Sequence, residues 1–144
     1  MIEEEAARRV RALMNKNGLR RWKLGIEDNR FDLGRTSLSK REIRLSREFI
    51  ALNDWDEVYK TAIHEMAHAK VNNPAESHGE DWRQAAIALG DPDPEDGVWD
   101  DKPGFNSPLT SKDIDDDPVL MMRMMLHDME NKVGYMQAEG TVYF

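Results

Sequence analysis

The motif His64-Glu65-Met66-Ala67-His68 constrains the fold of this chain most, because it requires a helix that presents polar side chains to a single point. Apolar residues at helical spacing predict such a helix over residues 55 to 72, with Asn53 or Asp54 as its cap. Its apolar stripe comprises Val58, Ala62, Met66 and Ala69. Residues four apart lie on one face, about 40° from each other around the axis. Both imidazoles can therefore reach one ion while the stripe faces the core.

The residue types in this motif indicate metal-assisted hydrolysis. His64 and His68 would be two ligands of the ion, whereas Glu65 can hold a metal-bound water and accept its proton, which is the task of the general base in a metallohydrolase. The 144 residues include no cysteine, so any metal must be bound by histidine or by carboxylates. The simpler interpretation is a pair of surface histidines on an amphipathic helix.

A catalytic zinc ion needs a third protein ligand and an open fourth position. The best candidate is His78, which lies ten residues after His68 and is followed by Gly79, where the backbone can approach closely. Three carboxylates are the competitors: Glu76, Glu80 and Asp81. Four residues could stabilise the oxyanion, and the sequence does not choose between them: Tyr59, Arg83, Tyr135 and Tyr143.

The flanking segments predict an α+β fold in a single domain. Apolar spacing predicts a helix over residues 2 to 18 and another over residues 80 to 89, the latter with Trp82 on its apolar face. Apolar residues alternate with other residues at positions 22 to 26 and again at 31 to 33, on either side of the turn-like Glu27-Asp28-Asn29, which predicts a hairpin. Residues 43 to 46 are predicted to form a third strand. We therefore expect a small three-stranded antiparallel sheet.

Together, four segments resemble the SprT-like zinc metalloprotease domain family: residues 64–68, His78-Gly79-Glu80-Asp81-Trp82, Leu33-Gly34-Arg35-Thr36 and Ile43-Arg44-Leu45-Ser46. The resemblance covers about residues 5 to 90. It implies a zincin-like (minigluzincin-type) fold and a zinc-dependent endopeptidase. Carried over by residue, it makes His64, His68 and His78 the Zn²⁺ ligands and Glu65 the catalytic base. The family includes the Spartan proteases, which degrade proteins crosslinked to DNA.

The second half of the chain departs from many members of that family, which carry a cysteine-rich zinc ribbon there. We expect residues 1–90 to form the metalloprotease core, residues 91–117 an acidic proline-rich linker, and residues 118–144 a methionine-rich helix and tail that pack on the core. The final residues 141–144 could add a strand. The acidic linker could also lie across the site and inhibit it.

Charge is unevenly distributed along the chain. The formal net charge is -8, yet residues 1–50 hold 13 Lys and Arg against 8 Asp and Glu. A basic N-terminal region could therefore contact DNA as well as a protein or peptide substrate. Its cations are Arg8, Arg9, Arg11, Lys16, Arg20, Arg21 and Lys23. A non-catalytic, zinc-stabilised module that binds protein or DNA is the alternative function.

The sequence also bears on location. No apolar run approaches the roughly 20 residues needed to span a bilayer, and the first residues are acidic where a secretory signal would be basic. We expect an intracellular, cytoplasmic protein with no membrane partner. The natural substrate and the oligomeric state are not predicted.

Overall fold

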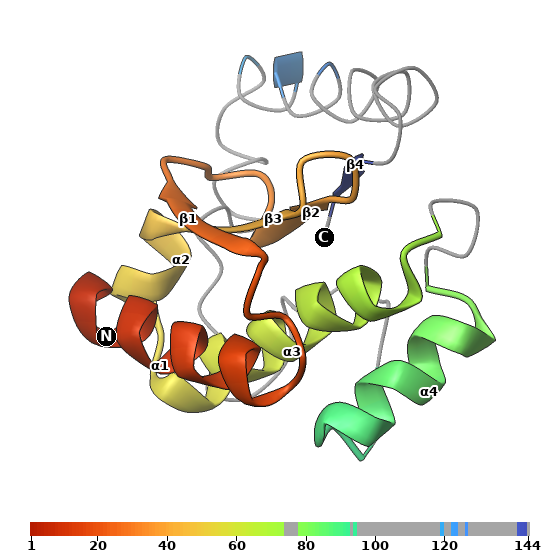
Figure 1. The fold of residues 1–144 in the computed structure, drawn as a ribbon. Helices are drawn as coiled ribbons and strands as arrows, with labels where there is room; N and C mark the ends of the chain where they lie inside the picture. The colour runs from red at the N-terminus through yellow and green to blue at the C-terminus, as the bar shows by residue number, and fades with distance from the viewer. Residues whose placement is uncertain are drawn as a thin grey trace.

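A computed structural model describes residues 1–73, 78–92, 94, 119, 122, 123, 126 and 141–143. In chain order, the elements are α1 (Glu3–Lys16), β1 (Lys23–Glu27), β2 (Gly34–Ser37), β3 (Glu42–Ser46), α2 (Arg47–Leu52), α3 (Trp55–Val71), α4 (Glu80–Leu89) and β4 (Thr141–Tyr143) (Figure 1). The predicted helices α1, α3 and α4 are confirmed to within two residues at each end. The expected linker 91–117 lies almost entirely outside the described residues, as does most of the expected C-terminal helix.

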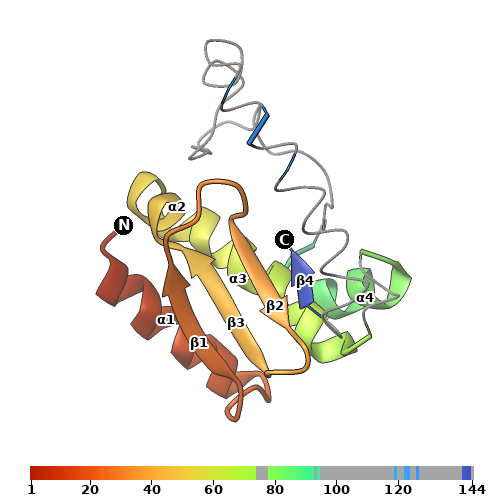
Figure 2. The same cartoon turned by 90° about the horizontal axis from the view of Figure 1, so that it is seen from above.

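The sheet has the strand order β1-β3-β2-β4 (Figure 2). Strand β3 pairs in parallel with β1, with Ile26 opposite Leu45, and antiparallel with β2, with Thr36 opposite Ile43. Strand β4 pairs antiparallel with the other edge of β2. The sheet is therefore mixed rather than purely antiparallel, and it has four strands rather than three. The strand suggested for the last residues is confirmed for residues 141–143.

The predicted hairpin between β1 and β2 is wrong, because these strands do not pair with each other: each pairs with β3, which lies between them. The side-chain oxygen of Asn29 accepts hydrogen bonds from the backbone N–H groups of Phe31 and Asp32, which bends the chain locally. The hydroxyl of Ser46 donates to the backbone carbonyl of Asn29, and the Ser46 N–H donates to the carbonyl of Leu33. These bonds fix the connection across the end of β3, so β3 lies between the two strands.

Helix α3 is the central element of the fold. The sheet and α1 pack against its apolar stripe, as the sequence predicts, while α4 packs on another side (Figure 1). The stripe residues Val58, Ala62, Met66 and Ala69 are all buried. Residues 61 to 69 are in fact buried without exception. Polar groups on this stretch of α3 are consequently shielded from bulk water.

The short helix α2 follows β3 without a break and was not predicted. Its N-cap is Ser46, whose hydroxyl accepts a hydrogen bond from the N–H of Phe49. Phe49 and Ile50 are buried and anchor the helix in the core. None of the helices in the described part of the chain is long and apolar enough to cross a membrane.

Candidate metal centre

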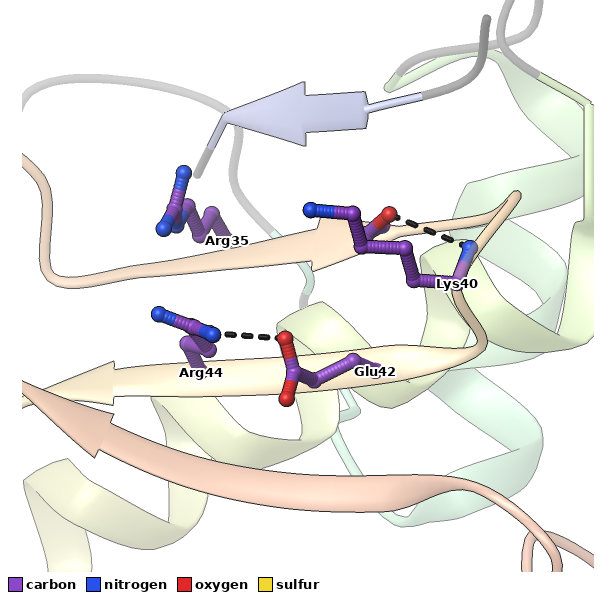
Figure 3. Close-up of a pocket in the computed structure, with 5 residues that line it drawn as sticks. Arg35, Lys40, Glu42 and Arg44 are labelled. Atoms are coloured by element: carbon purple, nitrogen blue, oxygen red, sulfur yellow. Dashed lines mark hydrogen bonds and ion pairs between the residues drawn. The ribbon is translucent and has the colours of Figure 1, made fainter.

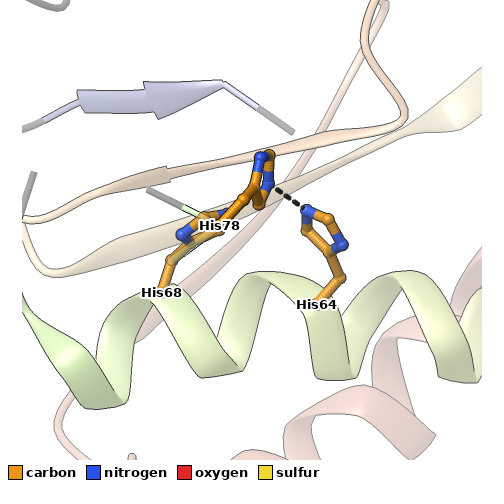
Figure 4. Close-up of side chains that lie close together, drawn as sticks. All are labelled: His64, His68 and His78. Carbon is orange, nitrogen blue, oxygen red and sulfur yellow. Dashed lines mark hydrogen bonds between the residues drawn. The ribbon is translucent and has the colours of Figure 1, made fainter. Parts of the chain in front are cut away.

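Three histidines from two segments meet at one point. His64 and His68 lie one turn apart on α3, and His78 reaches them from the turn that precedes α4 (Figure 4). The Nε2 atom of His78 is 2.9 Å from Nε2 of His64 and 3.2 Å from Nε2 of His68. Tetrahedral zinc with Zn–N bonds of 2.0–2.1 Å requires nitrogen atoms about 3.3 Å apart. The three side chains could therefore hold one metal ion with little rearrangement.

Burial keeps these imidazoles available as ligands. His64 and His68 are only 3% and 4% exposed, so the interpretation as a pair of surface histidines is wrong. Burial, together with the nearby His78, lowers the pKa of His68 to about 3. A neutral imidazole keeps the lone pair that a metal needs, and zinc accepts nitrogen ligands readily. The donor set therefore fits Zn²⁺.

Trp82 of α4 supports all three histidines. Its indole N–H donates a hydrogen bond to the backbone carbonyl of His64 at 3.2 Å. Its ring meets His64 and His78 edge-on, with centroids 4.8 and 4.9 Å apart, and stacks on His68 at 5.8 Å. The sequence predicts Trp82 on the apolar face of its helix, and it is indeed buried. The contact with the imidazoles was missed, although the position of Trp82 four residues after His78 was a signal for it.

The backbone at His78 adopts a conformation that is uncommon for a residue with a side chain. Its φ angle is 59°, in the left-handed region. This turn returns the chain toward α3 before α4 begins at Glu80. Of the competing ligands, Glu80 and Asp81 are exposed in the first turn of α4, and Glu80 accepts a hydrogen bond from Gln84. Glu76 lies outside the described residues.

Glu65 is fully buried and its carboxylate is only half satisfied. The hydroxyl of Thr36, on β2, lies 2.9 Å from Oε1. Oε2 has no hydrogen-bond partner in the described structure. Burial raises the pKa of Glu65 well above its usual value, the Thr36 hydrogen bond lowers it, and the charge of Asp32 raises it further. The carboxylate therefore has one fixed oxygen and one that is free to accept a proton.

Gly34 on β2 makes room for this glutamate. A Cβ atom at Gly34 would lie 3.0 Å from the backbone oxygen of Arg44 and 3.1 Å from Cγ of Glu65. Both contacts are shorter than normal packing allows, and the backbone oxygen cannot move aside easily. In the sequence, Gly34 and Thr36 belong only to a segment that carries the family resemblance; in the structure, Thr36 contacts Glu65 and a side chain at Gly34 would collide with it.

The opposite face of the sheet carries a separate polar pocket. Figure 3 shows Arg35, Lys40, Glu42 and Arg44 on the side of β2 and β3 that points away from α3; Ser37 also lines this pocket. Arg44 donates to Glu42 at 2.7 Å, and Arg35 pairs with Glu27. Because these cations are matched by neighbouring carboxylates, this pocket makes a weak anion site.

Two of the four candidates for oxyanion stabilisation are placed by the structure. Arg83 donates a hydrogen bond to the backbone carbonyl of Pro94, and the hydroxyl of Tyr59 lies against Gly90. Neither contact involves the three histidines. Tyr135 lies outside the described residues, and only the backbone of Tyr143 is described, in β4.

The fold and the site together define an α+β protein with a helix-borne three-histidine centre able to bind a metal, beside a buried glutamate. A family model confirms the resemblance: the SprT-like family matches residues 5–98, and the chain belongs to this family. The family is associated with metalloprotease-type activity. A search of curated proteins found no match.

Proposed function

We propose that this protein is a zinc-dependent endopeptidase of SprT-like type, with His64, His68 and His78 as metal ligands and Glu65 as the catalytic base. The observation that carries the proposal is the buried Glu65 carboxylate, one residue along α3 from His64; one of its oxygens has no hydrogen-bond partner among the described residues. Membership in the family and the convergence of the three histidines support it further.

Each residue of the proposed site has a separate role in peptide hydrolysis. A zinc ion, when bound, polarises the peptide carbonyl and lowers the pKa of water to about 7. Glu65 accepts a proton from the attacking water through Oε2 and delivers it to the leaving amine. Thr36 fixes the other oxygen, so the carboxylate keeps one orientation through both transfers. Burial makes this carboxylate more basic than an exposed one, which suits proton transfer near neutral pH.

The non-catalytic alternative does not account for Glu65. A module that only held zinc would need the three histidines, but it would gain nothing from a buried carboxylate with one oxygen that no described residue pairs. Such a group costs folding free energy, because burial disfavours its charged form. A buried glutamate that is costly to the fold and adjoins a proposed metal ligand in the sequence is expected where it serves a reaction.

The proposal is tested by metal content and proteolysis. We expect the purified protein to carry about one zinc ion per chain and to cleave casein, to lose cleavage when the metal is chelated, and to regain it when zinc is restored. The triple variant His64→Ala/His68→Ala/His78→Ala should lose both the zinc and the cleavage. The control is His127→Ala, which alters the fourth histidine of the chain. Equal zinc content in the triple variant and the wild type would contradict the proposed ligands.

DNA-associated proteins are the substrate class that we propose. In the N-terminal region, Arg8 and Arg9 pair with Glu5, and Arg11 donates to the backbone carbonyl of Trp22. The support comes from the four other cations, which are exposed: Lys16, Arg20, Arg21 and Lys23. We expect a DNA-bound protein to be degraded faster with DNA present than without it. Equal rates would remove DNA from the proposal and leave the peptidase intact.

A further inference from the structure

Three buried polar atoms without a partner lie in one row along α3. In the described part of the chain, the buried side-chain oxygen and nitrogen atoms that lack a hydrogen-bond partner are Oε2 of Glu57, Oγ1 of Thr61 and Oε2 of Glu65. Their residues are spaced four apart, so they follow one side of the helix at successive turns, about 6 Å apart along its axis. The row therefore begins at the proposed catalytic base and runs toward the N-terminal end of α3.

This row shares a side of α3 with the two metal ligands of that helix. At about 100° per residue, Glu57 and Thr61 fall within about 60° of the two histidines around the helix axis. Figure 4 shows the imidazoles of His64 and His68 on this side of α3. Thr61 and Glu57 are 0% and 8% exposed, much as the two histidines are 3% and 4% exposed. A substrate that reaches the metal centre therefore meets the side of the helix that carries Thr61 and Glu57.

No contact within the described chain accounts for these two buried side chains. Glu57 is the third residue of α3, where a glutamate can accept a hydrogen bond from the backbone N–H of the N-cap residue, yet its Oε2 accepts none. No ion pair joins Glu57 to a cation of the described residues. A threonine in a helix often donates to the carbonyl four residues earlier, but Oγ1 of Thr61 has no described partner. The fold thus keeps two buried oxygens unmatched, at a cost in folding free energy.

The chemistry of the row selects a positively charged ligand. A carboxylate only accepts hydrogen bonds, and a buried negative charge is stabilised most by a cation. Lysine and arginine carry such donors at the end of a long apolar stem. Glu57 lies about 12 Å from Glu65 along the helix axis. Two residues of extended chain span about 7 Å, and a long side chain covers the rest.

From this row, we infer that Glu57 and Thr61 bind the charged side chain of a substrate lysine or arginine that lies within two residues of the cleaved bond. The inference rests on the proposed peptidase function and deepens it. The Glu57 carboxylate accepts a hydrogen bond from the ammonium or guanidinium group, and the Thr61 hydroxyl accepts a second one. Both are specificity-determining residues and take no part in breaking the bond.

Pairs of peptides test this inference on the zinc-loaded full chain. The bonds that the wild type cleaves in casein are first identified by mass spectrometry, and we expect lysine or arginine within two residues of most of them. One cleaved peptide is then remade with a neutral side chain of similar length, citrulline for arginine or norleucine for lysine. We expect kcat/KM to be at least tenfold lower for the neutral peptide, mainly through KM, because the buried carboxylate is then left without a counterion.

Variants of the row assign this preference to its residues. Glu57→Gln should cleave the basic and neutral peptides at rates within twofold of each other, and the neutral peptide as fast as the wild type does. Casein cleavage is retained in Glu57→Gln, because the variant keeps the metal ligands and Glu65 and loses only the preference. Thr61→Val should weaken the preference and Thr61→Ser should keep it. The matched control is Asp56→Asn, which removes an exposed carboxylate at the neighbouring position of α3 and should keep the tenfold preference.

Equal rates of the wild type on the basic and neutral peptides would overturn the inference, and this comparison needs no variant. Cleavage sites in casein with no excess of basic neighbours would overturn it as well. So would a preference that survives in Glu57→Gln with wild-type zinc content and circular dichroism. A wild-type protein that carries zinc but cleaves neither casein nor the peptides would instead refute the peptidase proposal itself, and with it this inference.

Discussion

The substitution Thr36→Val removes the hydroxyl that holds Glu65 and leaves a side chain of similar shape. Thr36 is fully buried, and its hydroxyl lies 2.9 Å from Oε1 of Glu65, whose Oε2 is already without a partner in the described structure. In the variant, neither oxygen of the Glu65 carboxylate would accept a hydrogen bond from a side chain of the described residues. We expect Thr36→Val to weaken catalysis by making the ionised form of Glu65 harder to maintain.

The magnitude follows from the strength of one hydrogen bond. A buried hydrogen bond to a charged group contributes about 1.5–3 kcal/mol, and one pKa unit corresponds to about 1.4 kcal/mol. Because the bond favours the charged form, its loss raises the pKa of Glu65 further. The acidic limb of the kcat/KM profile should therefore move to higher pH. Cleavage on that limb then falls by about 10- to 100-fold and recovers in alkali.

The assay is casein cleavage from pH 5 to 9 by the wild type, Thr36→Val and Thr36→Ser, at equal zinc content. Thr36→Ser keeps the hydroxyl and should keep the wild-type profile, even if the missing methyl group lowers thermal stability. Superimposable profiles for the wild type and Thr36→Val, with both proteins folded and loaded with zinc, would refute the reasoning about Glu65.

Two further predictions concern the surroundings of Glu65. Gly34→Ala should destabilise the protein by about 1–3 kcal/mol and lower cleavage, because the new Cβ meets the backbone oxygen of Arg44 and Cγ of Glu65. Gly25→Ala is the matched control: its Cβ meets only the flexible Arg44 side chain, at 3.2 Å, so urea unfolding should show a smaller loss. Glu65→Gln should stabilise the zinc-free protein at pH 7 by about 1–3 kcal/mol. Folding raises the pKa of Glu65 above its ordinary value of 4.5, so the cost of burying the ionised group appears as pH rises above 4.5. The gain should therefore be absent in urea unfolding at pH 4, and an equal gain at both pH values would contradict a cost of ionisation.

Local sequence patterns account well for helices α1, α3 and α4, though not for α2, and for the meeting of the three histidines. The spacing of His64 and His68 depends only on helix geometry, and Gly79 marks the turn that brings His78 back. These features are encoded within short windows, where periodicity and turn residues are informative. The resemblance to the SprT-like family, confirmed over residues 5–98, depends on the same windows.

The strand order could not be predicted in the same way, because it depends on contacts between distant segments. The alternation of apolar residues between positions 22 and 33 is equally compatible with a hairpin and with two strands that are separated by β3. A hydrogen bond between Asn29 and Ser46, which are 17 residues apart, helps to set this arrangement. The contacts of Trp82 with His64 and of Thr36 with Glu65 could not be predicted for the same reason, since each joins α3 to another element.

The central claim is that Glu65 serves the reaction rather than the binding of the metal. Zinc content and casein cleavage should be measured side by side for the wild type, Glu65→Gln and Glu57→Gln. Glu57 is a second buried glutamate on α3, two turns earlier, so the same substitution there controls for loss of a buried charge. We predict equal zinc in all three proteins, with cleavage abolished only in Glu65→Gln. Cleavage by zinc-loaded Glu65→Gln at the rate of Glu57→Gln would contradict the account.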